Sequence, residues 1–292
     1  MHTGRAYIVT GGSSGMGQAV VKKLLSLSAT VHTIDKAGQM PIVSLPDSDR
    51  LHFHPNIDIS SHEKVTQTFE SIIQQSPVIS GLVNCAGIIL PSNILEPVEN
   101  FNKVMAVNVG GTWNMGTTYL GYVLERHADT MRDKKEGSVP EGIGSMVNIG
   151  STASLFGSPG IASYCASKHA VLGLTRTWAK DFGDKGVRVN CVAPGATDTP
   201  LLGGVPPAFV DYYVKNVPLR RLARPEEIAN TVAFLLSDDA SYINGQVIPV
   251  EGLYNPQDAT SYSRTARDAL IAGSQTPTSC YDVTLDGFSS IL

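Results

Sequence analysis

Tyr164 and Lys168 are four residues apart, a spacing that places two side chains on one face of a helix. The ammonium of Lys168 can then lie beside the phenol of Tyr164. A free tyrosine has a pKa of about 10, too high for a base at neutral pH, and a neighbouring cation lowers that pKa. The pair therefore predicts a tyrosine that transfers protons in catalysis. Such pairs also occur in helices without a catalytic role, so the prediction depends on the rest of the chain.

A serine precedes this pair at a distance that suits the same chemistry. Ser151 lies thirteen residues before Tyr164 and could orient the oxygen of a substrate whose proton Tyr164 accepts or donates. Thr152 and Ser154 are alternatives for this role. Each of the three hydroxyls could instead cap a turn.

A glycine-rich run, Thr10-Gly-Gly-Ser-Ser-Gly-Met-Gly17, lies between an expected strand over residues 6–10 and an expected helix over residues 17–28. A tight turn there directs backbone N–H groups and the positive end of the helix toward a pyrophosphate. We therefore predict that the run binds the phosphates of a dinucleotide; a flexible turn is the alternative. The residues expected to bind are Gly11, Ser13, Ser14, Gly15, Met16 and Gly17.

Asp35 lies at the end of the next expected strand, residues 30–34, twenty residues after Gly15. A carboxylate at this place can accept hydrogen bonds from the adenosine ribose, and it would repel the 2′-phosphate of NADP. This favours NAD as the cofactor. Lys36 follows directly and could pair with that phosphate, which leaves NADP as the alternative. Asp35 could also be only a solvated carboxylate at a strand end.

The composition is that of a globular protein: of 292 residues, 42% are hydrophobic and 16% are charged. The net charge of −4 and the lack of a basic block argue against a nucleic acid or an anionic membrane as partner. The first strand begins so early that we expect no signal peptide, and no apolar stretch is long enough to span a membrane. The four cysteines are widely spaced and form no metal-binding pattern. We expect a cytoplasmic protein without a metal.

Short β-branched runs alternate with segments of helical periodicity. Further strands are expected over residues 52–57, 81–84, 145–149, 187–192 and 246–250, and helices over 62–75, 98–126 and 163–182. Alternation of this kind predicts an α/β fold: a doubly wound parallel sheet, Rossmann-like, in three αβα layers. We assign residues 1–252 to a single domain with its ligands at the carboxyl ends of the strands. Residues 128–144 are expected to form a long loop, and residues 253–292 a tail without its own core.

The chain resembles the short-chain dehydrogenases/reductases from about Gly4 to Gly252. The motifs that carry the resemblance are Thr10-Gly-x-x-x-Gly-x-Gly17, Asp58-Ile59, Asn84-x-Ala-Gly87, Asn108, Ser151, Tyr164-x-x-x-Lys168, and Pro194-Gly195 with Thr199. They stand in the order and spacing of that family. The resemblance implies an oxidoreductase that interconverts a secondary alcohol and a ketone with NAD or NADP.

The resemblance also implies a role for each matched position. Asp58 and Ile59 would hold the adenine edge, and Asn84, Ala86 and Gly87 would line the adenosine ribose and stabilise the sheet. Tyr164 and Lys168 would contact the nicotinamide ribose, and Val192 and Thr199 would bind the carboxamide. Pro194 and Gly195 would also belong to the cofactor site. Asn108 would hold a water at a helix distortion and complete a catalytic tetrad with Ser151, Tyr164 and Lys168. Alternatively, Asn108 is an amide inside a helix that bonds to backbone.

Residues 199–221 are expected to form a flexible lid over the substrate, as the segment does in relatives. Its apolar residues, among them Leu201 and Phe209, favour a hydrophobic small molecule, although they could also pack the lid against the body. Phe156 is expected in the same pocket. By the same resemblance, we expect a homodimer or homotetramer formed through the helices over 98–126 and 163–182 and the last strand. The tail, from Ala259 to Leu292, could lie across a pocket mouth.

The sequence thus predicts an NAD(H)-dependent oxidoreductase acting on a hydrophobic secondary alcohol or ketone, with Tyr164 as acid and base. One alternative is an NADPH-dependent ketone reductase of a biosynthetic pathway. Another is a dinucleotide-binding protein without redox turnover, and a third is a cofactor-binding fold used for non-redox chemistry such as a cyclisation.

Overall fold

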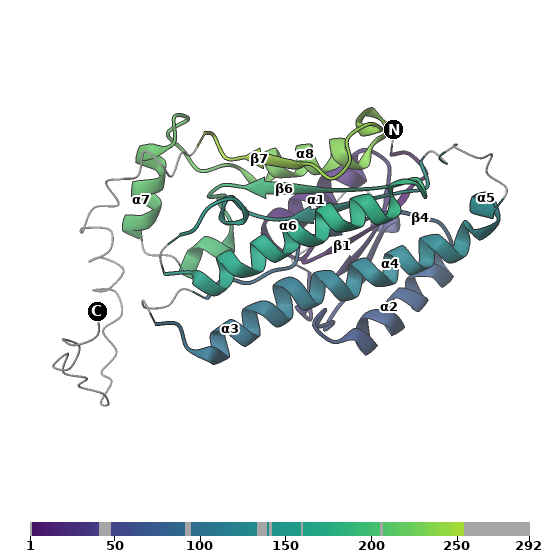
Figure 1. The fold of residues 1–292 in the computed structure, drawn as a ribbon, viewed down its shortest axis with the longest axis horizontal. Helices are drawn as coiled ribbons and strands as arrows, with labels where there is room; N and C mark the ends of the chain where they lie inside the picture. The colour runs from purple at the N-terminus through teal and green to yellow at the C-terminus, as the bar shows by residue number, and fades with distance from the viewer. Residues whose placement is uncertain are drawn as a thin grey trace, which may run out of the picture.

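The computed structural model of the chain describes residues 2–40, 48–90, 95–132, 139, 142–158, 160–204 and 207–253. Among these, seven parallel strands form one sheet in the order β3-β2-β1-β4-β5-β6-β7 (Figure 1). The strands are β1 Ala6–Thr10, β2 Thr30–Ile34, β3 Leu51–His54, β4 Ile79–Asn84, β5 Gly144–Ile149, β6 Val187–Pro194 and β7 Val247–Val250. The doubly wound parallel sheet predicted from the sequence is confirmed.

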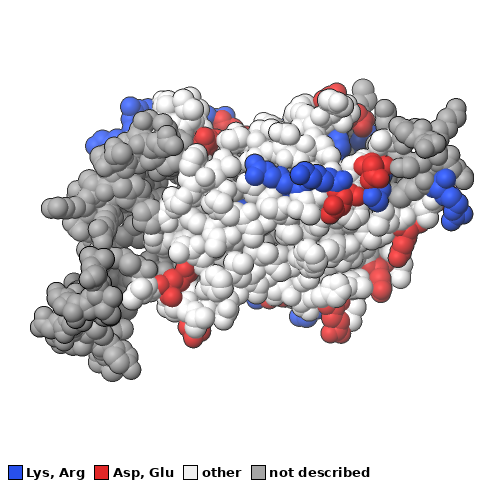
Figure 2. All heavy atoms as spheres, viewed as in Figure 1, with Lys and Arg blue, Asp and Glu red and all other residues white. Residues whose placement is uncertain are grey.

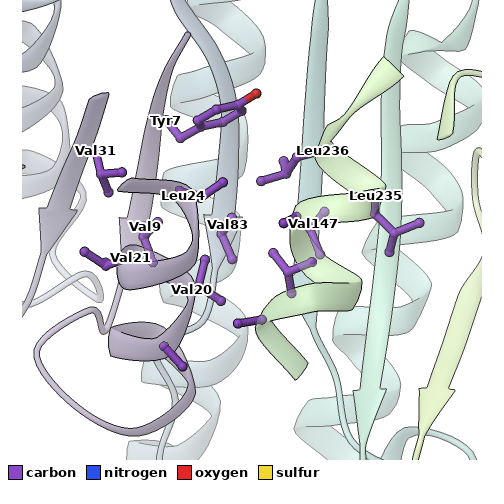
Figure 3. Close-up of a cluster of buried hydrophobic side chains, with 14 of the residues drawn as sticks. Tyr7, Val9, Val20, Val21, Leu24, Val31, Val83, Val147, Leu235 and Leu236 are labelled. Carbon is purple, nitrogen blue, oxygen red and sulfur yellow. The ribbon is translucent and has the colours of Figure 1, made fainter. Parts of the chain in front are cut away.

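Helices cover both faces of this sheet. They are α1 Gly15–Ser26, α2 His62–Gln75, α3 Val98–Met105, α4 Thr112–Arg126, α5 Ala128–Arg132, α6 Ala162–Gly183, α7 Pro207–Asn216 and α8 Pro225–Leu236, with a π-helix, η2 Ala106–Gly111, between α3 and α4. Side chains alternate along a strand, so Tyr7 and Val9 pack against α1 and α8 (Figure 3), whereas Ala6 and Ile8 pack against α2, α4 and α6. The three-layer αβα arrangement is therefore confirmed.

The direction of winding reverses between β1 and β4. β2 pairs with β1 on one side and β4 pairs with it on the other, with Thr10 opposite both Ile34 and Asn84. The carboxyl ends of the three strands are therefore level. The loops that follow β1 and β4 diverge there, and such a switch point is where ligands bind in open α/β sheets. The glycine-rich run, Asp35 and the segment after Asn84 all lie at this edge.

The predicted helix over 98–126 is divided into α3, η2 and α4. Its middle turn is a π-helix that contains Asn108, so the helix distortion that the resemblance implied at this residue is present. Gly111 closes the π-helix, and a Cβ there would stand 2.4 Å from the Ile59 side chain. The close approach to Ile59 explains why this turn has a glycine.

The prediction missed α8, although the sequence carries its signals. Pro225 is the first residue of the helix, and Glu227 accepts a hydrogen bond from the backbone N–H of Arg224 at 2.7 Å. Its apolar face is buried against α1, so tertiary packing adds to the local signals. The loop expected over 128–144 begins with α5, and the expected lid contains α7 and a 3-10 turn, η4 Pro200–Gly204.

Some predictions lie outside the described residues. The structure describes the tail, residues 253–292, only at Leu253, and the single domain over residues 1–252 stays a prediction. Within the described part of the chain, no helix is long and apolar enough to cross a membrane. In the same residues, no group of three or more His, Cys, Asp or Glu side chains is placed to hold a metal ion.

Candidate active site

The glycine-rich run forms the turn between β1 and α1. Gly11 and Gly15 adopt φ angles of 71° and 51°, a left-handed conformation that favours glycine. A Cβ at Gly17 would stand 2.1 Å from the carbonyl oxygen of Gly11, so the start of α1 packs directly on the turn. Thr10 Oγ1 accepts hydrogen bonds from the backbone N–H groups of Cys85 and Ala86 at 3.0 and 3.1 Å. This joins the turn to the segment after β4.

The N-terminus of α1 has the features of an anion site. Its N-cap residue, Ser14, makes no side-chain capping bond, and the first turn has no acidic residue. The first N–H groups of the helix therefore remain available to a phosphate. A cavity of about 340 Å³ opens here, lined by Ser13, Ser14, Gly15, Gln18, Ala19, Lys22, Asp198, Pro200, Pro225 and Glu226. The residues present thus fit a dinucleotide, and Gln18, Lys22 and Asp198 were not among the predicted ones.

Asp35 is held beside this turn by hydrogen bonds to both of its oxygens. Oδ2 accepts from the Ser13 hydroxyl and from the Ser13 backbone N–H at 3.0 Å, while Oδ1 accepts from Ala37 N–H at 2.9 Å. Lys36 points elsewhere: its Nζ donates to Asp58 Oδ2 at 2.7 Å. Hydrogen bonds from Lys36 and Ser60 lower the pKa of Asp58 to about 2. The carboxylate of Asp35 is therefore fixed at the strand end, and the neighbouring cation is paired.

Asn84 connects three elements inside the protein. Its Nδ2 donates to Asn148 Oδ1 at 2.9 Å, and Asn148 Nδ2 donates to Thr175 Oγ1 of α6 at 2.9 Å. Asn84 is buried, so this chain of amides stabilises the alignment of β4, β5 and α6. The sheet-stabilising part of its expected role is supported; its contact with a ribose stays a prediction.

Tyr164 lies in the first turn of α6, and Lys168 lies one turn later on the same face. Lys168 Nζ stands 5.6 Å from the centre of the Tyr164 ring and donates to Ile149 O at 2.8 Å. The Lys168 side chain is buried, which lowers its pKa. The predicted pairing of the two residues is therefore present.

The pKa of Tyr164 differs from the prediction. Burial raises it to about 12, and a hydrogen bond with Ser151 opposes this rise. The expected lowering by Lys168 is not seen, because desolvation of the buried phenol is the largest effect on this pKa. Tyr164 is therefore protonated at neutral pH, the form that donates a proton.

Ser151 follows β5 and is the serine that contacts Tyr164. Its Oγ also accepts a hydrogen bond from Ala153 N–H at 3.1 Å. Ser154 is buried, and its hydroxyl accepts from the Ser151 N–H at 3.1 Å. Turn capping is therefore present for Ser154 and also for Ser151, whose Oγ caps the 3-10 turn η3 Thr152–Ser154. Of the two, Ser151 is the one that affects the phenol of Tyr164.

Asn108 joins the π-helix to the segment after β4 and to α6. Its Oδ1 accepts from Ile88 N–H at 2.8 Å, and its Nδ2 donates to Ile88 O at 2.9 Å and to Ser167 Oγ at 3.0 Å. A Cβ on Gly87 would stand 3.2 Å from Asn108 Oδ1 and 3.5 Å from Lys168 Nζ. Asn108 and Lys168 thus flank the same glycine. The Asn108 side chain therefore bonds to backbone, as in the alternative interpretation. That backbone belongs to Ile88, in the segment after β4, and not to the helix of Asn108 itself.

The remaining predicted cofactor and substrate residues have fewer contacts with the glycine turn or with Tyr164. Thr199 lies against the glycine turn, since a Cβ on Gly15 would stand 3.3 Å from its side chain. Val192 is fully buried in the core, and its carbonyl accepts the Gly150 N–H at 2.8 Å, so its contact with a carboxamide stays a prediction. Gly195 N–H donates to Val250 O at 3.0 Å, which fixes the chain beyond Pro194. For Phe156 and Leu201, contact with a substrate stays a prediction, and the side chain of Phe209 lies outside the described residues.

Comparison with known proteins places this arrangement in a family. A sequence model described as Enoyl-(Acyl carrier protein) reductase matches residues 11–255. The 3-oxoacyl-[acyl-carrier-protein] reductase of Thermotoga maritima is 30% identical, with 85% of this chain and 97% of the relative covered. The chain belongs to the short-chain dehydrogenases/reductases. A 3alpha-hydroxysteroid dehydrogenase of Mediterraneibacter gnavus is 33% identical, with 84% of this chain and 94% of the relative covered.

Solved structures of this short-chain dehydrogenase/reductase fold agree. A 3-ketoacyl-(acyl-carrier-protein) reductase from Brucella melitensis, complexed with NADH, has a TM-score of 0.76 at 28% identity, over 87% of this chain and 99% of that one. ElxO with NADP bound has a TM-score of 0.73 at 27% identity, over 86% of this chain and 98% of that one. The chain is therefore an oxidoreductase of the kind that acts on alcohol and ketone groups.

Proposed function

We propose that this short-chain dehydrogenase/reductase interconverts a hydrophobic secondary alcohol and its ketone with NAD(H), and that Tyr164 is the acid and base. The observation that carries the proposal is the pairing of Tyr164 and Lys168 on one face of α6, with Lys168 Nζ 5.6 Å from the centre of the Tyr164 ring. Ser151 lies close enough to the phenol to oppose the rise in its pKa. A nicotinamide cofactor, when bound, supplies the hydride acceptor or donor. The protein's own residues handle the proton and the geometry.

Each residue of the site has one task in this chemistry. In reduction, Ser151 donates a hydrogen bond to the ketone oxygen and Tyr164 gives that oxygen its proton. In oxidation, the alcohol proton passes to the oxygen of Tyr164. The Lys168 ammonium stabilises the phenolate that forms in reduction, and Asn108, which flanks Gly87 together with Lys168, is the group that would hold a water for the return of the proton.

Two contacts support NAD over NADP. Asp35 presents a fixed carboxylate beside the glycine turn, where a 2′-phosphate would be repelled. Lys36, the cation that could attract this phosphate, is paired with Asp58 at 2.7 Å. The Lys36 side chain is 75% exposed, however, and exposed ion pairs are weak, about 0–1 kcal/mol. An NADPH-dependent ketone reductase is the second candidate, since Lys36 could leave Asp58 for a phosphate.

Titration of the protein with NADH and NADPH, followed by the fluorescence of the reduced nicotinamide, separates the two candidates. We expect NADH to bind at least about tenfold more tightly, because a tenfold ratio needs only about 1.4 kcal/mol of repulsion at Asp35. Asp35→Asn should reduce this ratio by removing the charge. Asp239→Asn, a change at an exposed carboxylate beyond α8, is the matched control and should leave both affinities unchanged. Tighter binding of NADPH by the unmodified protein would establish the second candidate.

The substrate class follows from the apolar lid and from the relatives. Leu201, at the start of the lid, is 37% exposed, and the lid contains further apolar residues. We propose a hydrophobic substrate and would test turnover with a 3α-hydroxysteroid and NAD, and with a 3-oxoacyl thioester and NADH. Turnover of either probe supports the redox function. NADH binding without turnover of these two and of a wider panel of secondary alcohols would favour a dinucleotide-binding protein.

We further propose that the protein forms a homodimer or homotetramer. Val98 and Phe101 of α3 and Trp113 of α4 are large apolar side chains that are 44% to 60% exposed. Figure 2 shows that few charged side chains lie over α3 and α4 on this face. An uncharged, partly apolar helical face is suited to pairing with a second copy.

A further inference from the structure

The helix that carries Tyr164 and Lys168 has no cap of its own. Its N-cap residue, Ile161, has no side-chain hydrogen bond, and its first turn has no acidic residue. The N–H of Cys165 bonds to Ile161 O at 3.0 Å, which leaves the first three N–H groups of α6 without a partner in the helix. Tyr164 belongs to this first turn. Its position therefore depends on what else holds the turn.

A carboxylate from a distant segment supplies the missing cap. Glu96 Oε2 accepts the Ser163 N–H at 2.9 Å, and Glu96 Oε1 accepts the Ser163 hydroxyl. Ser163 is only 2% exposed and Glu96 is half-buried, so the donor side of both hydrogen bonds is shielded from water. A negative charge at a helix N-terminus is favourable, and charge-assisted hydrogen bonds are about twice as strong as neutral ones. The contact joins residues 67 apart and is made at Ser163, directly before Tyr164 in the first turn of α6.

A second contact holds the same face of α6 one turn later. Ser167 Oγ donates to Tyr164 O at 2.7 Å and accepts from Asn108 Nδ2 at 3.0 Å. Ser163 and Ser167 are four residues apart and stand on one face of the helix. Their partners, Glu96 and Asn108, lie just before α3 and in the π-helix that follows it. The continuous segment from Glu96 to Asn108 thus forms hydrogen bonds with α6 on both sides of Tyr164, at Ser163 and at Ser167.

We propose that Glu96 is a positioning residue for Tyr164, which it holds in place through Ser163. By fixing the first turn of α6, Glu96 sets the position of the phenol relative to Ser151 on the other side of the site. A misplacement of about 1 Å can lower a rate about 100-fold, so a cap at this turn affects the chemical step. The inference rests on the proposed redox function and adds to it a residue that contacts neither Tyr164 nor Ser151 in the described hydrogen bonds.

Hydrogen–deuterium exchange of the cofactor-free protein tests the contact without any substrate. In Glu96→Ala we expect faster exchange of the amides of residues 162–166, by about tenfold or more, with no change in α8. Glu99→Ala is the matched control, because Glu99 is exposed in the first turn of α3, three residues further along the chain. Unchanged exchange in Glu96→Ala would overturn the proposal at once.

Kinetics with the steroid or thioester probe then separate positioning from a purely structural role. We expect Glu96→Ala to lower kcat about tenfold, with KM and the Kd for NADH within about twofold of the unmodified values. Glu96→Gln should restore most of kcat, because its amide can accept from the Ser163 N–H and donate to the hydroxyl. The pH profile of kcat should keep its midpoint, since the contact acts through position.

Two kinetic results would also overturn the inference. One is faster exchange in Glu96→Ala with kcat unchanged, which would make the cap structural only. The other is a rise in the Kd for NADH as large as the fall in kcat, which would assign the effect to the cofactor site. If the unmodified protein bound no dinucleotide, the proposed function would fail, and with it the effect of Glu96 on turnover. The exchange measurement would still decide separately whether Glu96 holds the first turn of α6.

Discussion

Replacing Tyr164 by phenylalanine is expected to lower kcat about a thousandfold, the middle of the range for removal of an acid–base group. The phenol is protonated at neutral pH, since its pKa is raised to about 12, and Tyr164 is the residue that Ser151 contacts. Phenylalanine keeps the ring under Lys168 but cannot give or take the proton. The Kd for NADH should therefore stay within about twofold. Steady-state turnover and the nicotinamide fluorescence titration give the two quantities.

The control for this prediction is another tyrosine with a bonded hydroxyl. Tyr122 of α4 accepts a hydrogen bond from Ile79 N–H at 3.0 Å and donates to Pro77 O at 2.8 Å, on the α2–α4 side of the sheet. Tyr122→Phe removes the same oxygen and should leave kcat unchanged, although it lowers stability by about 1 kcal/mol. Retention of more than about a tenth of kcat in Tyr164→Phe would contradict the assignment of Tyr164 as acid and base.

Much of the fold follows from local sequence patterns. The helix over His62–Gln75 was predicted with its observed bounds, because Ser61 accepts the Lys64 N–H as a cap and apolar residues recur with helical spacing. The strands were predicted within three residues at each end, since β-branched runs are bounded by turn residues. α8 shows the opposite error: a proline, two glutamates and an apolar stripe were all present and were not combined into a helix.

The site could be predicted as a set of residues but not as a set of contacts. Motif spacing indicates Ser151, Tyr164 and Lys168, because their order along the chain is fixed by the strands and helices that carry them. The contact of Glu96 with Ser163 depends on how α3 packs on α6, and no local pattern encodes it. A signal was available: a helix of 22 residues that begins without a polar N-cap or an acidic first turn needs a cap from elsewhere.

The direction of the pKa shift of Tyr164 could not be predicted from the sequence either. The sequence reveals that a cation lies one helical turn away, which alone lowers the pKa of a phenol. It does not reveal how far the phenol is removed from water, and desolvation acts in the opposite direction. In the folded chain the burial effect exceeds the others.

The protein is expected to lose about 3 kcal/mol of stability between pH 7 and pH 4 through one histidine in β2. His32 is fully buried, stacks on His52 with ring centres 4.5 Å apart, and places its Nδ1 3.2 Å from His54 Nε2. Burial, and then the charges that His52 and His54 would carry, lower the pKa of His32 to about 3. In the unfolded chain the group returns to about 6.5, so between these values the unfolded state binds the extra proton. The stabilisation is present above pH 6.5 and is lost as the pH falls toward 3.

Urea denaturation at pH 7 and pH 4 measures this loss, and variants assign it. His32→Gln removes the titrating group. The loss of unfolding free energy from pH 7 to pH 4 should therefore be about 3 kcal/mol smaller in this variant than in the unmodified protein. The comparison of differences cancels the packing cost of the substitution, which is the same at both pH values. His62→Gln, at an exposed position that begins α2, should keep the full loss. An equal loss in His32→Gln and in the unmodified protein would mean that the acid sensitivity does not originate at His32.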